Sequence, residues 1–394
     1  MAPSEIIKHM QDAAAAYDRE ELGARATLLD LNRQLLAELE TPTDFVQRIW
    51  FTTASLGGSL EVANNTKIFQ HLQKAKDGLT TQVLSEKTGI AESLLDRFMR
   101  HFAAHKVVTF SKPTGWRATD LSNTLARENY QHSISFCQRA AAKSFCFFPD
   151  HFKQANYQHP GLPDGPYQYA HNSSLPFDWL VANPPYVNWF GSFMSVYRAG
   201  NPDWWEFYPV EERLAFGFDK VKSDVFVVDV GGGRGHDLLS FANGIKSPGR
   251  LILQDLPEVI VDVTEATTFE IQAHDFFTPQ PVPGARAYFL HSILHDWSAE
   301  HGVQILKSLK PALTPGYSKV LINEIVLSEE NPSLPATSMD MMMLGHIGEA
   351  CERTEEDFRA IEADAGLEVV GIFSNAASPE SVIELMLPSR EKQA

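Results

Sequence analysis

The sequence predicts a doubly wound α/β domain preceded by a helical region with the outline of a winged helix. From residue 225 onward, apolar strand-like runs ("VFVVDV", "GRLILQDL", "GARAYFLHSIL", "SKVLINEIVL") alternate with helical stretches such as "HGVQILKSLKPAL". This alternation is typical of a sheet covered by helices. The residues before it have apolar positions at helical spacing. We therefore expect three regions: 1–120, 121–220 and 221–394.

Composition narrows the classes of protein. The chain has 394 residues, 44% hydrophobic and 21% charged, and a formal charge of −17. Such a charge repels phosphate backbones, so nucleic acid is not an expected partner. No apolar run reaches the roughly 20 residues of a membrane span, and the N-terminus lacks a secretory signal. Three cysteines form no metal or disulfide framework, which favours a reducing, cytoplasmic compartment.

The N-terminal segments are predicted to be helical. Residues 4–40 indicate one or two helices, with a break at "ETPTD", where Pro42 opens the next helix. The helix predicted over 44–72 is apolar on more than one side. Such a helix often packs against a second subunit, which would make a homodimer, although a central helix of a large domain shows the same pattern.

Residues 79–120 have the outline of a winged helix: a helix, a turn at Gly89, a second helix to about His105 and two short strands around "PTG". Winged helices commonly bind DNA. Here the second helix offers only Arg97 and Arg100 among acidic residues, which favours a structural or dimerisation role. Residues 121–220 are mostly helical, and their aromatic, proline-rich interruption (147–179) could wall a pocket for a flat ligand or be irregular packing.

A glycine-rich turn follows the first strand, in "VDVGGGRG". Gly231, Gly232 and Gly233 allow backbone amides to approach a ligand closely. Asp229 precedes them. The spacing departs from the dinucleotide fingerprint G-x-G-x-x-G, because His236 stands where the third glycine is required.

Acidic residues follow the next strand ends. Asp255, with Leu256 beside it, could accept both ribose hydroxyls, and Asp275 with Phe276 would suit an adenine amino group and a purine face. Taken singly, each could be a loop cap or core aromatic. In this order, they predict a nucleoside site.

"YFLHSILHDW", residues 288–297, carries His291 and His295 four residues apart. On a helix such a pair could ligate zinc, but no third ligand stands nearby in a metal pattern, so we expect no metal. His295 could instead be a buried structural residue or a general base.

"VDVGGGRG", "LILQDLPEVI", "HDFF", "LHDW", "INEIVL" and "ERTEEDF…AGL" together resemble the S-adenosylmethionine-dependent O-methyltransferases of the plant caffeate and fungal secondary-metabolite type. The resemblance implies a Rossmann-like catalytic domain, a winged-helix dimerisation domain and S-adenosylmethionine as cofactor. It implies that His295 is the catalytic base and that two carboxylates, Glu324 and Glu352, lie near it. His291 falls where this family often has lysine near the cofactor, which leaves its role open.

The expected chemistry is methyl transfer to a hydroxyl of an aromatic or heteroaromatic natural product, in the polyketide or alkaloid range. A phenol has a pKa of about 10, so a neutral histidine can accept its proton as the new bond forms. Asp296 is expected to help order the site. In "SMDMMMLGHIG", Met339, Met343 and His346 could contact the substrate, or the methionines could be ordinary core residues.

Two alternatives remain on this scaffold. Some fungal relatives that share the "FLxxILxD" stretch steer pericyclic rearrangements. In such a relative an arginine occupies the position of His295, so the histidine in this sequence favours methylation. A winged-helix regulator that senses the cofactor is disfavoured by its acidic recognition helix. "ANPPY" (182–186) spells a motif of DNA amino-methylating enzymes, but it precedes the glycines, which favours a proline-rich turn.

Overall fold

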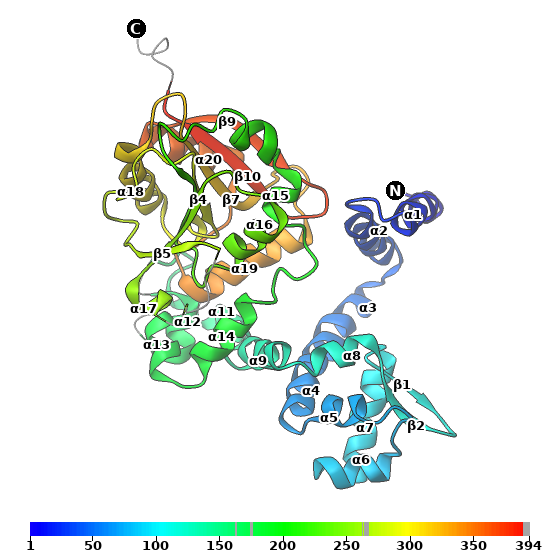
Figure 1. The fold of residues 1–394 in the computed structure, drawn as a ribbon. Helices are drawn as coiled ribbons and strands as arrows, with labels where there is room; N and C mark the ends of the chain where they lie inside the picture. The colour runs from blue at the N-terminus through cyan, green and yellow to red at the C-terminus, as the bar shows by residue number, and fades with distance from the viewer. Residues whose placement is uncertain (162–163, 174–175, 262, 264–267, 389–394) are drawn as a thin grey trace.

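The computed structural model describes residues 1–161, 164–173, 176–261, 263 and 268–388. Figure 1 shows a sheet-containing part, a winged-helix part and a group of short helices between them. Leu162, Pro163, Ser174 and Leu175 of the proline-rich interruption lie outside the described residues. None of the helices in the described ranges is both long and apolar enough to cross a bilayer.

The N-terminal residues form two helices that pack on each other. α1 (Pro3–Asp18) and α2 (Ala24–Leu39) meet through Ile6, Ala13 and Leu31. The break predicted at "ETPTD" is confirmed, because Thr41 caps α3 (Pro42–Gln47), which has Pro42 in its first turn. Proline is tolerated there because the first amides of a helix have no partner within it.

The helix predicted over 44–72 is shorter than expected. α3 continues through the π-helical η1 (Arg48–Thr53) into α4 (Ala54–Asn65), but Lys67 has a left-handed φ of 58°, and α5 (Ile68–Gln73) begins after it. A left-handed residue turns the backbone out of the helical path. The spacing of apolar residues does not reveal this break, because the buried Ile68 and Phe69 continue the helical apolar pattern beyond Lys67.

The predicted winged helix is confirmed. α6 (Thr81–Thr88) ends at Gly89, whose φ is 72°, and α7 (Glu92–Ala104) follows. β1 (Val108–Ser111) and β2 (Gly115–Ala118) then form an antiparallel pair. Arg100, one of the two arginines of α7, is ion-paired with Asp96 on the same helix, so its charge is neutralised locally.

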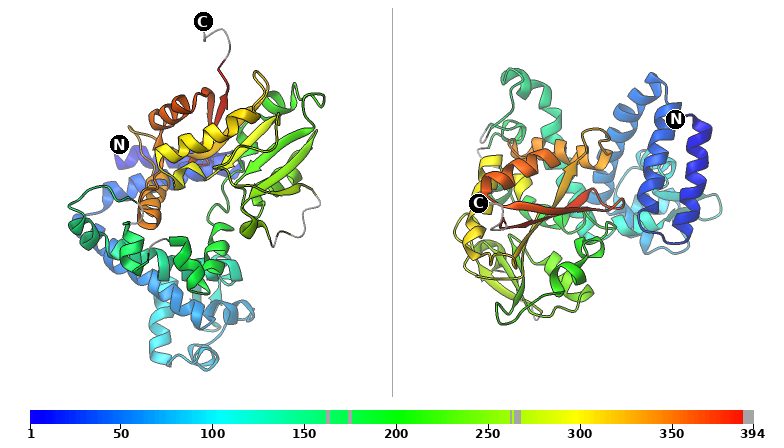
Figure 2. Two further views of the ribbon diagram at one scale, coloured as in Figure 1. Left: turned by 90° about the vertical axis from the view of Figure 1, so that its left-hand side faces the viewer. Right: turned by 90° about the horizontal axis from the view of Figure 1, so that it is seen from above.

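Short helices connect the winged helix to the sheet, as predicted for 121–220. The left-hand view of Figure 2 shows most of them, in teal and green, below the sheet. They are α8 (Asp120–Leu125), α9 (Glu128–Phe136), η2 (Cys137–Ala141), α10 (Ala142–Cys146), α11 (Phe148–Gln154), α12 (Pro166–His171), α13 (Pro176–Ala182), α14 (Tyr186–Met194), α15 (Trp204–Phe207) and η3 (Glu211–Ala215). "ANPPY" forms the connection between α13 and α14, which agrees with the predicted turn.

The C-terminal part is a mixed eight-stranded sheet with the order β5-β4-β3-β6-β7-β10-β9, and β8 pairs with β7. The strands are β3 (Val225–Val230), β4 (Arg250–Asp255), β5 (Glu270–Ala273), β6 (Ala287–His291), β7 (Lys319–Leu327), β8 (Arg353–Thr354), β9 (Glu368–Ser374) and β10 (Glu380–Met386). β3 to β7 run parallel, whereas β10 is antiparallel to β7 and β9. The strand order reverses at β3, and the carboxyl ends of the strands beside such a point form the ligand crevice of doubly wound folds.

Helices cover both faces of the sheet. The remaining helices are α16 (His236–Gly244), α17 (Pro257–Ile260), η4 (Leu294–Asp296), α18 (Ala299–Leu309), η5 (Lys310–Ala312), α19 (Leu334–Ile347) and α20 (Glu355–Ala365). α18 and α20 pack on one face with Leu290, and α15 and α16 pack on the other with Phe289. Neighbouring strand residues point to opposite faces, so this sheet needs the continuous apolar runs seen in its sequence.

β5 is the strand expected to end before Asp275, but no apolar run marks it. Its sequence is "EIQA", and three of its four residues are exposed. An edge strand is paired on one side only and need not be buried, so hydrophobicity does not reveal it.

Glu362 of α20 is a buried acid with an unusual environment. It is fully buried, and neither carboxyl oxygen has a hydrogen-bond partner among the described residues. Burial raises the pKa of Glu362 to about 8. Because the folded state holds this proton more tightly than the unfolded state, the stability it confers is complete below about pH 4.5 and is lost as the pH rises through 8.

We therefore expect Glu362→Leu to be more stable than the wild type at pH values above about 8. Its free energy of unfolding should be higher by about 1–3 kcal/mol, and its melting temperature should be higher as well. The variant should also flatten the fall in stability between about pH 4.5 and pH 8, measured by thermal melts across that range. Glu356→Leu, at an exposed site on the same helix, is the control. An unchanged pH dependence in Glu362→Leu would contradict the assignment.

Candidate active site

The glycine turn after β3 is closely packed against a buried carboxylate. A Cβ atom on Gly232 would lie 2.4 Å from the Asp229 carboxyl, and one on Gly231 would lie 2.7 Å from Ile293 Cδ1. Gly231 and Gly233 have φ values of 74° and 59°. Position 231 requires glycine because its φ is positive and because a Cβ atom would clash with Ile293. Position 232 requires glycine only because a Cβ atom would clash with Asp229.

Asp229 is 1% exposed, and neither of its carboxyl oxygens has a hydrogen-bond partner among the described residues. Burial, together with the nearby charge of Asp237, raises the pKa of Asp229 well above its ordinary value. An isolated buried carboxyl is unfavourable unless a partner arrives. The turn therefore fits a ligand that brings a hydrogen-bond donor or a positive charge.

Asp255 closes the turn from the neighbouring strand. One of its oxygens accepts the Gly233 amide at 2.7 Å, and the other accepts the Leu256 amide at 2.7 Å. Each carboxylate oxygen can accept a further hydrogen bond. Two oxygens so fixed can receive two adjacent hydroxyls.

Asp275 and Phe276 follow β5 at the same edge of the sheet. Asp275 is exposed, and its side chain accepts the Phe277 amide at 2.9 Å. The Phe276 ring is partly buried and lies near the glycine turn, where a Cβ on Gly231 would come within 3.3 Å of it. The predicted nucleoside-binding residues therefore lie at the carboxyl ends of neighbouring strands.

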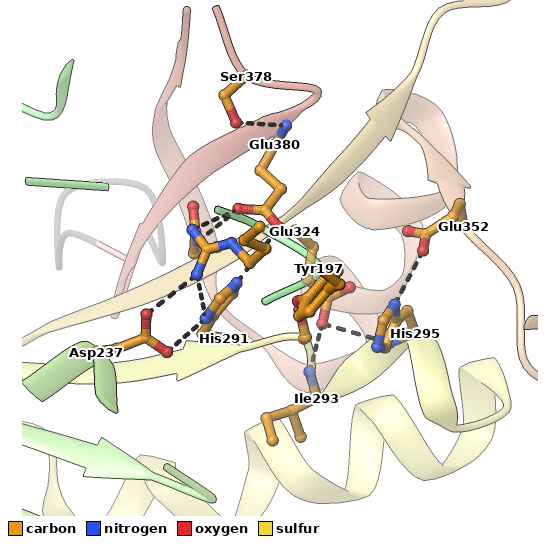
Figure 3. A network of polar contacts seen from close by, with 12 residues as sticks. Tyr197, Asp237, His291, Ile293, His295, Glu324, Glu352, Ser378 and Glu380 are labelled. Carbon is orange, nitrogen blue, oxygen red and sulfur yellow. Dashed lines mark hydrogen bonds and ion pairs between the residues drawn. The ribbon is translucent and has the colours of Figure 1, made fainter. Parts of the chain in front are cut away.

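His291 ends β6 and belongs to a buried ionic network (Figure 3). Its Nδ1 lies 2.7 Å from Asp237, its Nε2 lies 3.4 Å from Glu380, and Arg198 bridges the same two carboxylates at 3.0 and 2.8 Å. Burial favours the neutral ring, but the charges of Asp237 and Glu380 outweigh it and raise the pKa of His291 to about 9. His291 is therefore a cation at neutral pH. In this respect it is equivalent to the lysine that the resembled family often has at this position.

The two histidines do not share one helix face. His291 ends a strand, whereas His295 lies in the 3₁₀ turn η4, and each is bonded to a different set of carboxylates. In the described part of the chain, no group of three or more histidine, cysteine or acidic side chains is arranged to hold a metal ion.

The segment that carries His295 is clamped from both sides. One Glu324 oxygen accepts the amides of Ile293, Leu294 and His295, at 3.1 Å for Ile293 and 3.3 Å for His295. Arg353 donates to the carbonyl groups of Leu294 and Trp297. Glu324 thus holds the backbone of the turn, not the imidazole ring of His295.

Glu352 holds the ring itself. Its carboxylate lies 2.9 Å from His295 Nδ1, and Figure 3 shows the two side chains pointing toward one another. Asp296 lies 3.6 Å from Nε2. Burial favours the neutral ring, but the charges of Asp296, Glu352 and Glu324 outweigh it and raise the pKa of His295 to about 10.

An apolar cavity opens beside His295 and Asp296. Met339, Met343 and His346, all from α19, line it, so the predicted substrate residues share one wall. Five aromatic residues also line it: Phe136, Tyr167, Phe190, Phe193 and Tyr197. Flat rings and methionines together suit a flat aromatic ligand.

Several residues of the site were missed from the sequence. Tyr197 lines the cavity, and its hydroxyl lies 3.4 Å from Ser292, which has a left-handed φ of 53°. Arg198 and Glu380 complete the network of His291. Asp237 could have been noticed, because it lies in the first turn of the helix after the glycines, whereas nothing in the sequence around 198 or 380 marks a site.

Comparisons with known proteins agree with this geometry. Residues 191–368 match the O-methyltransferase domain family, and residues 54–128 match the O-methyltransferase dimerisation domain family. The chain is 46% identical to the O-methyltransferase mpaG of Penicillium brevicompactum over 98% of this chain and 99% of that protein.

Solved structures show the same fold. One described as a pericyclic reaction enzyme has a TM-score of 0.87 and 25% identity, covering 98% of this chain and 99% of that one. LepI in complex with S-adenosylmethionine has a TM-score of 0.87 and 24% identity, with 98% and 100% covered. The scaffold thus serves more than one chemistry, but the full-length similarity to mpaG shows the family to which this chain belongs. The chain belongs to the S-adenosylmethionine-dependent O-methyltransferases, with a Rossmann-like catalytic domain and a helical dimerisation domain.

Proposed function

We propose that His295 is the general base that removes the proton from an aromatic hydroxyl of a small molecule as this hydroxyl attacks the methyl group. The observation that carries the proposal is the His295–Glu352 pair at the wall of the aromatic cavity. In the neutral form of the ring, a carboxylate on Nδ1 keeps the proton on that nitrogen and leaves the Nε2 lone pair as acceptor. Glu324 positions the turn, and Asp296 stabilises the imidazolium that forms.

S-adenosylmethionine supplies an electrophilic methyl group on a positively charged sulfur. We propose that it is held by Asp229, the turn of Gly231, Gly232 and Gly233, Asp255 with Leu256, and Asp275 with Phe276. We propose that His291 supports this cofactor site through its ionic network, which joins the first turn of α16 to the segment that carries Tyr197. Alignment of methyl donor and acceptor supplies most of the remaining rate enhancement.

The acceptor side is proposed to be the cavity lined by Asp296, Met339, Met343 and His346. The test is transfer of label from methyl-labelled S-adenosylmethionine to a panel of phenols and N-hydroxy indoles, with products analysed for O-methylation or N-methylation. Labelled phenol ethers support the proposal. Cofactor binding without transfer to any acceptor would instead favour a rearrangement enzyme on this scaffold.

The glycine turn yields a prediction about cofactor affinity. Gly232→Ala should displace the Asp229 carboxyl, because the new methyl would lie 2.4 Å from it. We expect the dissociation constant of S-adenosylmethionine to rise at least about tenfold, measured by calorimetry. Gly58→Ala, where an added Cβ meets nothing within 4 Å, is the control. Equal affinities in both variants would contradict this role of Asp229 and the turn.

We also propose that residues 1–120 act as the dimerisation region, that 121–220 supply pocket walls, and that 221–394 form the catalytic domain of a homodimer. Trp50 and Phe51 of η1 are 70% and 68% exposed in the single chain, beside exposed Phe45, Val46 and Ile49. A continuous apolar surface of this kind usually meets a partner. The match to the dimerisation family supports the same conclusion.

Light scattering at micromolar protein should therefore give twice the mass of the 44.0 kDa chain. Trp50→Asp should weaken the dimer at least about a hundredfold, because it places a charge in an apolar interface. Phe110→Asp, at a site exposed on the wing, should leave the dimer intact. A monomeric wild type would contradict the proposal.

A further inference from the structure

Two residues that line the cavity each have a side-chain polar atom without a hydrogen-bond partner among the described residues. These atoms are Tyr167 Oη, on α12, and His346 Nε2, in the last turn of α19. Both residues line the same cavity as His295. Tyr167 is 0% exposed, so water in bulk does not satisfy its hydroxyl. An unpaired buried polar group is unfavourable, and two of them on residues that line one cavity point to a ligand that completes them.

The hydrogen-bonding capacity of His346 follows from its other nitrogen. Nδ1 lies 2.9 Å from the carbonyl oxygen of Met342, which can only accept, so Nδ1 carries the proton. Burial lowers the pKa of His346 to about 4, which keeps the ring neutral at physiological pH. Nε2 is therefore an acceptor. The Tyr167 hydroxyl can both donate and accept, and burial raises the pKa of Tyr167, so that it stays protonated.

Packing holds both rings in place. The centroids of Tyr167 and His346 are 5.5 Å apart. Tyr167 stacks on His171 at 4.2 Å, and His346 packs against Phe136 at 5.9 Å. Groups fixed before binding lose little entropy when a ligand arrives, which gives a hydrogen bond to them more of its full value.

The charge of this wall excludes acidic substituents. The residues that line the cavity include no lysine or arginine, and the one protonated histidine among them, His295, is already paired with Glu352 and Asp296. A carboxylate placed against Nε2 of a neutral His346 would face a lone pair without a donor. Burying such a charge unpaired is far more costly than burying a hydroxyl.

We propose that Tyr167 and His346 form a second polar subsite of the acceptor cavity, which binds an uncharged hydroxyl that donates to His346 Nε2 and accepts from Tyr167 Oη. The substrate is thus a phenol with a second free hydroxyl besides the one that is methylated. The proposal rests on the proposed function of the cavity and narrows its substrate class.

The test compares acceptor probes that differ only in one hydroxyl. Calorimetry on the full chain, saturated with S-adenosylhomocysteine, gives dissociation constants for the two naphthols, the dihydroxynaphthalene isomers and the hydroxynaphthoic acids. At least one dihydroxynaphthalene should bind about tenfold more tightly than either naphthol, and the acids should bind more weakly. Tyr167→Phe and His346→Phe should each abolish the advantage of the second hydroxyl.

Met342→Leu is the matched control, because it changes the shape of the same wall without removing a polar atom, and it should alter both classes of probe by a similar factor. Thermal melts establish that each variant is folded, and Tyr167→Phe retains the ring. The proposal is overturned if no dihydroxynaphthalene binds better than both naphthols, or if the advantage persists in both phenylalanine variants.

Failure of the subsite can be told apart from failure of the proposed function. Selective binding of dihydroxy probes without label transfer would contradict the proposed methyl transfer but not the proposed subsite. Label transfer to naphthols and dihydroxynaphthalenes with equal efficiency in wild type and variants would contradict only the proposed subsite.

Discussion

Replacing His295 by alanine is expected to lower kcat for methyl transfer by about 10²–10⁴-fold, the range that a positioned general base contributes. The dissociation constant of S-adenosylmethionine should stay within about twofold, because the ring lines the acceptor cavity and not the glycine turn. Single-turnover transfer of labelled methyl, together with calorimetry, measures the two quantities separately.

His105→Ala is a suitable control, because His105 follows α7 in the winged helix, outside the acceptor cavity. It should leave both quantities unchanged. Transfer by His295→Ala at the wild-type rate would remove His295 from the role of base and leave a structural role for the buried ring.

The pH dependence should show the charge environment of the same ring. His295 must be neutral to accept a proton, and its pKa is raised to about 10, so it is largely protonated near neutral pH. In the wild type, log kcat/KM should therefore rise with pH toward about 10, with a slope near one.

Glu352→Gln removes one of the charges that stabilise the imidazolium, so the rising limb should move to lower pH by about one unit or more. The plateau of kcat should fall about 10–10³-fold, because an amide can hold the ring in the wrong tautomer. Glu349→Gln serves as control, since this neighbouring acid has its ion-pair contact with His301, not His295. If the limb stays at the wild-type pH in Glu352→Gln, the pair does not set the pKa of the base.

The architecture could be predicted because buried strands have a plain signature. β3, β4, β6 and β7 are each largely buried, which demands apolar runs, and Asp229 and Asp255 stand out at their ends. The winged helix was visible for a related reason, since Gly89 ends a helix in a conformation that glycine adopts easily. The local sequence is sufficient to predict an element whose structure is determined by its own residues.

The rest of the site depends on contacts between distant segments. Arg198 and Glu380 are 182 positions apart, yet they form an ion pair at 2.8 Å. Glu324 lies near His295, as expected, but the sequence could not show that its oxygen binds the backbone that carries the ring, because this depends on how β7 pairs with β6. The aromatic residues of 121–220 could be suspected of walling a pocket, but Tyr167 could not be singled out from the other rings around it.

The most direct test of the central claim is a crystal structure with S-adenosylhomocysteine and a methyl acceptor identified by label transfer. We predict that the acceptor oxygen lies about 2.6–3.2 Å from His295 Nε2, while Nδ1 keeps its bond to Glu352. A structure in which Nε2 faces away from the acceptor, with its lone pair bonded inside the protein, would contradict the assignment of His295 as the base.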